Sequence, residues 1–236
     1  SGIWKPKEYT GSYGTNGFYL EFQNTADAGE DSSGNGNNFT GTGMDASDHV
    51  TDTPTNNFAT LNANDNTGTL SEGNLKDAIS TSSARSVTST IGVSSGKWYC
   101  EVVPTAMSGG GSGNNLMIGV VDDTFSAENS SSTYPFNHTT SVGYFAENGQ
   151  KKINGTFTSY GATFSVNDII GVAFNLDDDE ITFYKNGTTQ GTISHTFPSS
   201  QYRFYLSHGS SGGSTTAIIN FGQDGSFAGN KTAQGN

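Results

Sequence analysis

The sequence is poor in cysteine, in basic residues and in long apolar runs. Its 236 residues include one cysteine, Cys100, so no disulfide can form within the chain and a disulfide-stabilised scaffold is excluded. No apolar run approaches the length of a membrane-spanning helix, and no basic segment followed by an apolar one opens the chain, so we expect no membrane insertion. Because the first residue is Ser1 rather than Met, we expect a processed chain or a part of a longer one.

Charge of either sign is scarce, and the balance is acidic. Ten Lys and Arg residues stand against 22 Asp and Glu, which gives a formal net charge of -12 at pH 7. Such a surface repels the phosphates of nucleic acids and the head groups of anionic lipids, so we expect neither as a partner. Charged residues make up 14% of the chain, which is below the usual quarter, so Asn, Ser, Thr and Gly must supply much of the polar surface.

The clearest pattern that is present lies at residues 167–187. Apolar side chains alternate over residues 170–176 and again over residues 181–185, which is typical of strands. An acidic turn, residues 177–180, separates the two segments. The pair Asn186-Gly187 then favours a type I′ turn, in which both central positions need positive φ.

Short segments of the same kind recur along the chain between turns rich in Gly, Asn and Ser. They predict strands within residues 18–22, 69–75, 86–91, 96–103, 116–121, 141–146, 151–153, 202–206 and 217–222. No segment of useful length has a helical apolar period, and no repeat suggests a propeller or solenoid. The pattern therefore predicts a β-sandwich or barrel.

Three regions are expected on this basis. Residues 1–68 should form an N-terminal strand and an extended arm packing on the sandwich, residues 69–225 the sandwich itself, and residues 226–236 a flexible tail. The turn-rich segment 31–39 is interpreted as a surface linker. Its Asp and Asn oxygens would also suit calcium, but no EF-hand spacing is present, so calcium stays a structural option only.

Four segments, in order, resemble the SPRY (B30.2-like) family. Residues 96–102 resemble its Gly-x-x-Tyr-x-Glu-Val strand, residues 117–120 its Ile/Val-Gly-Val strand, residues 167–187 its Gly-Asp-x-Ile-Gly core with the Asn-Gly hairpin, and residues 219–222 its closing Asn-Phe-Gly. The resemblance covers about residues 69–223. It implies an all-β fold, an antiparallel two-sheet jelly-roll sandwich of the concanavalin type, and a protein that binds rather than catalyses.

The front of the chain resembles another group of proteins. Residues 13–22, 31–39 and 52–58 are similar to segments of tail-fibre and other virion surface proteins of tailed bacteriophages. This resemblance implies an extracellular place on a virion surface. It also implies a homo-oligomer, since fibre modules are commonly trimers.

Concanavalin-type folds also serve glycoside hydrolases, whose catalysis depends on paired carboxylates. A retaining hydrolase needs two carboxylates roughly 5–5.5 Å apart. The acidic run 177–180 lies in a turn and Glu101 is alone on its strand, so no enzyme and no catalytic residue is expected. The four histidines are dispersed, so no metal site is expected either.

The candidate binding site is the long loop from residue 122 to residue 140. It combines aromatic rings with carboxylate, amide and imidazole groups, which suit a carbohydrate because a ring stacks on the sugar while polar groups fix its hydroxyls. The residues predicted to bind a ligand are Asp122, Asp123, Tyr134, Phe136, Asn137 and His138. The same set suits a protein epitope, and Tyr134 and Phe136 could instead cover the edge of the sandwich.

Two functions remain open on the sequence. The first is a non-enzymatic virion surface or fibre module that recognises a host-surface glycan or protein through its loops. The alternative is a structural decoration or subunit-docking module of a capsid or extracellular filament, whose partners are neighbouring virion subunits. A polysaccharide hydrolase is a third and less favoured reading, for want of paired carboxylates.

Overall fold

The computed structural model describes residues 7–44, 46–49, 57–79, 85–108, 116–127, 135–208 and 214–232. The chain divides into two compact units, Ser1–Phe58 and Ala59–Asn236. The second unit begins before residue 69, where the sandwich was expected to start, because its first strand already opens at Leu61.

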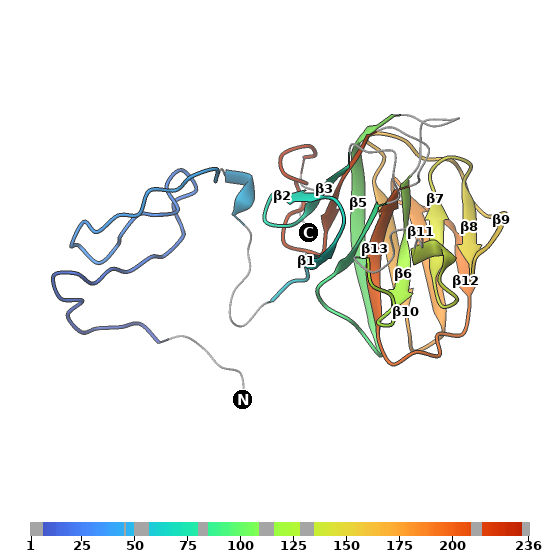
Figure 1. Ribbon diagram of the computed structural model, residues 1–236, viewed down its shortest axis with the longest axis horizontal. Coiled ribbons are helices and arrows are strands. Elements are labelled where there is room, and N and C mark those ends of the chain that lie inside the picture. Colours follow the sequence, from blue (N-terminus) through green and yellow to red (C-terminus); the bar gives the residue numbers. More distant parts are fainter. Residues whose placement is uncertain are drawn as a thin grey trace. The chain divides into compact units, whose positions relative to one another are not determined.

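The second unit is an antiparallel β-sandwich of two seven-stranded sheets (Figure 1). The first sheet has the order β1 (Leu61–Asn66), β4 (Arg85–Ser89), β13 (Tyr202–His208), β6 (Leu116–Asp122), β7 (Val142–Phe145), β8 (Gln150–Ile153) and β9 (Thr156–Ser159). The second has the order β12 (Thr188–Ser194), β11 (Glu180–Lys185), β10 (Ile170–Asn175), β5 (Lys97–Met107), β14 (Thr215–Asn220), β3 (Lys76–Ile79) and β2 (Thr69–Ser71).

Helical structure in the described residues is limited to two single turns. These are the 3-10 helices η1 (Ala46–Asp48) and η2 (Pro135–Asn137), and the described residues contain no α-helix. The predicted all-β, two-sheet antiparallel sandwich is therefore confirmed.

The core lies between the sheets and is built from alternate residues of each strand. On β10, for example, Ile170, Val172 and Phe174 are each no more than 1% exposed. The ring of Phe174 lies 4.8 Å from that of Phe197 and 5.8 Å from that of Tyr202, in edge-on contacts. Because burying such a side chain contributes about 1.5–3 kcal/mol, the alternating pattern of the sequence is the main source of the sandwich's stability.

The hairpin at residues 167–187 forms as the sequence predicts. β10 pairs with β11 in unbroken register, and Asn186 and Gly187 have φ values of 49° and 78°, as a type I′ turn requires. The acidic turn between the strands is exposed, yet it also holds the backbone. The carboxylate of Asp177 accepts a hydrogen bond from the N–H of Gly96 at 2.7 Å, and that of Asp179 accepts one from Phe197 at 3.2 Å.

A buried polar pair crosses the sandwich from sheet to sheet. Asp77 on β3 is 0% exposed and His208 on β13 is 2% exposed, and 3.2 Å separates Asp77 Oδ2 from His208 Nε2. The other oxygen of Asp77 and the Nδ1 atom of His208 have no hydrogen-bond partner. The pair is therefore the main contact holding each of the two buried groups in an otherwise apolar layer.

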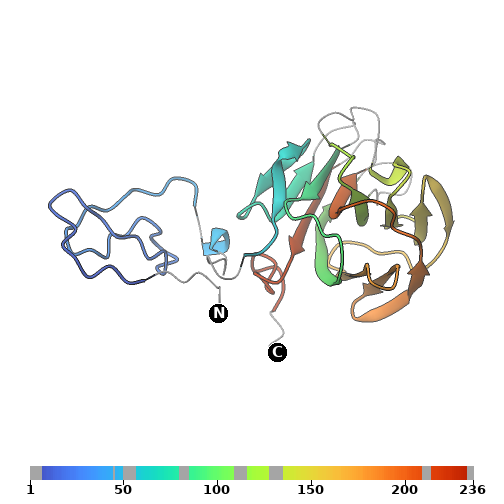
Figure 2. The same cartoon turned by 90° about the horizontal axis from the view of Figure 1, so that it is seen from below.

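The two ends of the sandwich lie beside each other. After β14 the chain forms turns in which the Phe227 ring is 2% exposed, although a flexible tail was expected from residue 226; residues 233–236 lie outside the described residues. Figure 2 shows this segment returning towards β1. There the side-chain amide of Gln223 donates a hydrogen bond to the carbonyl oxygen of Ala59 at 2.7 Å.

The N-terminal unit is organised by polar side chains instead. The strand predicted at residues 18–22 is wrong: the β-structure among residues 7–44 is limited to an isolated bridge between Leu20 and Asp31. Phe22 has a positive φ of 55° and is 62% exposed. The apolar residues alternate there as in a strand, but within residues 7–44 no neighbouring strand pairs with them and no apolar side chain is buried.

Asp31 is the centre of this unit. Its carboxylate accepts hydrogen bonds from the N–H groups of Tyr19, Ser33 and Asn37, at 2.8 to 2.9 Å, and from the Ser33 hydroxyl at 2.8 Å. Burial alone would raise the pKa of Asp31, but these hydrogen bonds outweigh it and lower the pKa far below its usual value. The segment 31–39 is thus a hydrogen-bonded turn whose carboxylate is already occupied by protein donors.

Candidate functional site

The predicted binding residues lie at the end of β6 and around η2. Asp122 is the last residue of β6, Asp123 follows it, Asn137 ends η2 and His138 comes next. Tyr134 lies outside the described residues, as do the rest of residues 128–134. Phe136 is described only as part of the η2 backbone.

Asp122 is an internal acceptor rather than an exposed ligand group. The residue is 3% exposed, and its carboxylate accepts hydrogen bonds from the hydroxyls of Ser199 at 2.6 Å and Thr124 at 2.7 Å. Burial alone would raise the pKa of Asp122, but the hydrogen bonds from Ser199, Thr124 and Thr140 and the nearby His138 lower it. The side chain therefore ties the end of β6 to two loops and stays ionised.

His138 completes this anchor. Its Nδ1 atom lies 3.5 Å from Asp122 Oδ1 and 3.0 Å from the Thr140 hydroxyl, and its Nε2 atom lies 3.4 Å from the Thr124 hydroxyl. Its ring meets that of Phe125 edge-on, at 6.0 Å. The imidazole is thus held by neighbours on both nitrogens.

Phe125 fastens the loop to the sandwich. It is 4% exposed and joins an apolar cluster with Met117, Val121 and Tyr205, which lie on the face of the first sheet that points away from the core. The sequence raised the possibility that Tyr134 and Phe136 cover the sandwich, and their side chains lie outside the described part of the chain. Phe125 is a loop aromatic that does cover the sheet. The spacing Asp122-x-Thr124, typical of a side-chain-capped turn, was the available signal that this end of the loop is closed.

Asp123 and Asn137 are the exposed members of the predicted set. The Asp123 carboxylate accepts one hydrogen bond, from the Ser200 hydroxyl at 3.3 Å. The side-chain oxygen of Asn137 accepts one from Lys152 at 2.6 Å, and burial lowers the pKa of that lysine. The carboxylate of Asp123 and the two N–H donors of Asn137 are therefore the groups that can reach a ligand.

The described residues of this site offer hydrogen-bonding groups from Asp123 and Asn137. Within the described ranges, no three His, Cys, Asp or Glu side chains come together in an arrangement able to hold a metal ion. Among the same residues, no helix is long and apolar enough to cross a bilayer. Cys100 is 1% exposed, and burial followed by the charge of Glu101 raises the pKa of its thiol, so it is not an activated nucleophile.

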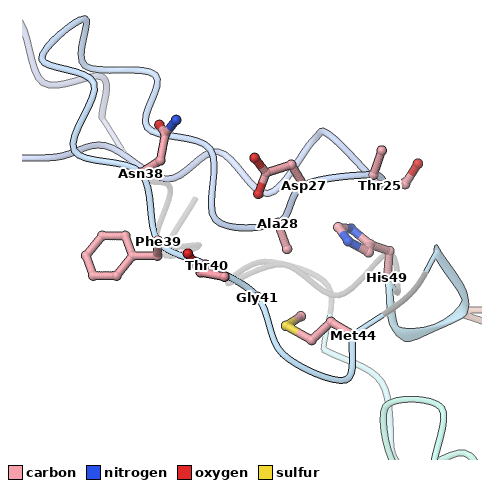
Figure 3. Close-up of a pocket in the computed structure, with 10 residues that line it drawn as sticks. Thr25, Asp27, Ala28, Asn38, Phe39, Thr40, Gly41, Met44 and His49 are labelled. Carbon is pink, nitrogen blue, oxygen red and sulfur yellow. The ribbon is translucent and has the colours of Figure 1, made fainter.

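The N-terminal unit contains a separate hollow that the sequence did not predict (Figure 3). It has a volume of about 420 Å³ and is lined by residues 25–28, 38–41, Met44 and His49. Asp27 is its one carboxylate, and this group accepts a hydrogen bond from the N–H of Gly29 at 3.1 Å. A single carboxylate and a single imidazole on an open surface define no ligand chemistry.

Comparison with known proteins identifies the fold family. Residues 97–224, more than half of the chain, match the SPRY domain family, and the chain therefore belongs to it. No curated protein matches the chain significantly.

Solved structures agree with this assignment. The SPRY domain of human HERC1 superposes with a TM-score of 0.59 at 15% identity, covering 70% of this chain and 99% of that one. Stonustoxin superposes with a TM-score of 0.53 at 20% identity, covering 69% of this chain and 27% of that one. The PSpry domain of TRIM65 superposes with a TM-score of 0.51 at 15% identity, covering 69% of this chain and 92% of that one. At such identities these structures establish the shared fold alone.

Proposed function

We propose that this chain is a non-enzymatic recognition module of a virion surface or fibre, and that it holds a host-surface glycan or protein on the loop from residue 122 to residue 140. The observation that carries the proposal is that the two described ends of this loop, residues 122–127 and 135–140, are held by buried side chains. Asp122, Phe125 and Lys152 are buried there, while Asp123 and Asn137 remain exposed. Groups that are held in place before binding lose little entropy when they take up a ligand.

The chemistry of the exposed groups favours a neutral ligand. A carboxylate and an amide can fix the hydroxyl groups of a sugar, and the predicted role of Tyr134 is to stack on its ring. The net charge of -12 opposes acidic glycans such as sialylated or sulfated chains. Among host glycans we therefore expect neutral ones to bind.

The test is an array of neutral and acidic glycans together with adsorption to host cells. We expect Asp123→Ala, Asn137→Ala and Tyr134→Ala each to weaken binding about tenfold, as the loss of a ligand hydrogen bond or stacking contact does. Asp178→Ala removes an exposed carboxylate on the other sheet and is the matched control, for which we expect unchanged binding. Failure of the unaltered chain to bind any host surface would argue against the proposal.

A docking module is the second candidate, and the N-terminal unit favours it. In its described part no apolar side chain is buried, while six large ones are 41% to 62% exposed. These are Tyr9, Phe18, Tyr19, Phe22, Phe39 and Met44. Exposed aromatic groups at this density mark contacts with other proteins, here neighbouring virion subunits or further copies in a homo-oligomer.

Deletion separates the two candidates. We expect the chain lacking residues 1–58 to lose its place in an assembled particle, or its oligomeric mass in solution, while the remaining sandwich keeps its glycan or cell binding. Loss of both properties together would place the recognition surface in the N-terminal unit, against the first proposal.

A further inference from the structure

The outer face of the second sheet carries an exposed tyrosine among small residues. On β5, β10 and β11 the side chains of Cys100, Val172 and Phe183 point into the core, so their neighbours in the strands point outward. Strand register places Tyr99 beside Ala173, and places Gly171 between Glu101 and Tyr184. This face belongs to the sheet opposite the one covered by Phe125.

The hydroxyl end of the Tyr99 side chain lies over Gly171 of β10. A Cβ atom added to Gly171 would lie 2.4 Å from the Tyr99 hydroxyl and 3.1 Å from two of its ring carbons. Because Gly171 has no side chain, the hydroxyl end of the Tyr99 ring passes close to the backbone of β10. Tyr99 is nevertheless 51% exposed, so much of its ring is open to solvent.

Glu101 polarises this ring. The Tyr99 hydroxyl donates a hydrogen bond to Glu101 Oε1 at 2.9 Å. Burial, followed by this hydrogen bond and the charge of Glu101, raises the pKa of Tyr99, so the phenol keeps its proton. A carboxylate that accepts a hydrogen bond from the phenol increases the negative potential on the exposed ring, and a cation is the group attracted most strongly to such a ring.

The charged side chains around Tyr99 also favour a cationic ligand. Along β5, β10 and β11 the outward charged side chains are Lys97, Glu101 and Glu180, and Lys97 pairs with Asp178 at 3.2 Å. In the described part of the chain no basic side chain pairs with Glu101 or Glu180. The face therefore carries uncompensated negative charge on a protein whose net charge is -12.

We propose that the Tyr99–Glu101 face binds an arginine side chain of a protein partner, with the guanidinium stacked on the exposed ring of Tyr99 and paired with the carboxylate of Glu101. Arginine fits better than lysine because its planar group stacks on a ring and pairs with a carboxylate at once. A neutral sugar would gain nothing from the negative charge of this face. The surface is independent of the loop at residues 122–140 and of the ligand proposed there.

The test uses the full chain and a pair of peptides. Gly-Arg-Gly-Arg-Gly is titrated against the backbone amide signals of Gly171 and Tyr184, and the same peptide with citrulline, which is neutral and nearly the same shape, is the matched control. We expect the arginine peptide to shift both signals, the citrulline peptide to leave them in place, and added salt to weaken the effect.

Variants then distinguish binding of the arginine peptide at the Tyr99–Glu101 face from its general attraction to an acidic protein. Tyr99→Leu keeps every charge, and we expect it to weaken binding about two- to fivefold. Glu101→Gln should weaken it to a similar extent, whereas Tyr19→Leu, which removes an exposed tyrosine of the N-terminal unit, should leave it unchanged. Equal shifts with citrulline, full binding by Tyr99→Leu, or larger shifts with a neutral oligosaccharide would each overturn the proposal.

Discussion

The two units of this chain keep their shapes by opposite means. In the sandwich, alternating apolar residues find a paired strand and a facing sheet, and Phe174 is 1% exposed. In the N-terminal unit a similar alternation finds neither, and Phe22 is 62% exposed while the carboxylate of Asp31 collects the hydrogen bonds. The comparison teaches that an apolar alternation specifies a strand only when the chain also supplies a partner for its backbone.

The largest contrast should come from removing one phenylalanine in each unit. Phe174→Ala leaves a cavity among Phe197, Tyr202 and Phe204, and we expect it to lower the free energy of unfolding by about 3–5 kcal/mol. Phe22→Ala removes an exposed ring, and we expect a change within about 0.5 kcal/mol. Denaturant unfolding measures both, and equal losses would break the contrast between the units.

A buried polar contact should contribute less to the free energy of unfolding of the sandwich than its apolar core does. Asp77→Ala removes the partner of His208 and leaves the imidazole buried without one, at a cost of about 1–3 kcal/mol. The double variant Asp77→Leu/His208→Leu removes both polar groups, and we expect it to recover part of this loss. A double variant less stable than Asp77→Ala would show that the pair contributes more than satisfaction of its own polar atoms.

A smaller effect is expected at the turns. Gly187→Ala puts a side chain at φ 78° in the β11–β12 hairpin, and we expect a loss of about 1 kcal/mol in the unfolding of the sandwich. Gly36→Ala makes the same change at φ 73° in the N-terminal unit. Because that unit is separate, we expect the midpoint of sandwich unfolding to stay where it is, and a shift of similar size would contradict the division.

The smallest effect on the stability of the sandwich should come from protonation of Asp31, which lies in the other unit. The pKa of Asp31 is lowered in the folded unit, so its stabilising contribution is complete above the ordinary aspartate value of 3.8 and is lost as the pH falls through the lowered pKa. We expect the amide signals of Ser33 and Asn37 to keep their folded positions at pH 4 and to move only in stronger acid. Asp31→Asn should lose those positions at neutral pH, and signals that move near pH 4 in the unaltered chain would refute this assignment.

The sequence was a good guide where a local rule and the global fold agree. The Asn186-Gly187 turn, the alternation at residues 170–176 and the nearly continuous apolar run at residues 116–121 all lie where predicted. It failed at residues 18–22 because alternation alone does not reveal a missing partner strand. It also gave no sign that Phe227, in a polar C-terminal stretch, would be buried.

The candidate site was predictable only in part. The sequence brought Asp122, Asp123, Asn137 and His138 into one loop, but it could not tell the buried carboxylate from the exposed one, since Ser199 lies far along the chain. It also left open which face of residues 96–103 meets the core. Pairing with β10 decides this, and only then does Tyr99 stand out.

The hydrogen bond between Gln223 and Ala59 has a consequence beyond stability. It brings residue 59, where the sandwich unit begins, next to residue 223, just after the last strand, so the chain enters and leaves the sandwich at a single place. A module attached in this way can be moved into a surface loop of another protein, or have its own ends joined and be reopened elsewhere, without drawing the host's backbone apart. Such portability suits the recognition role that we propose for this chain.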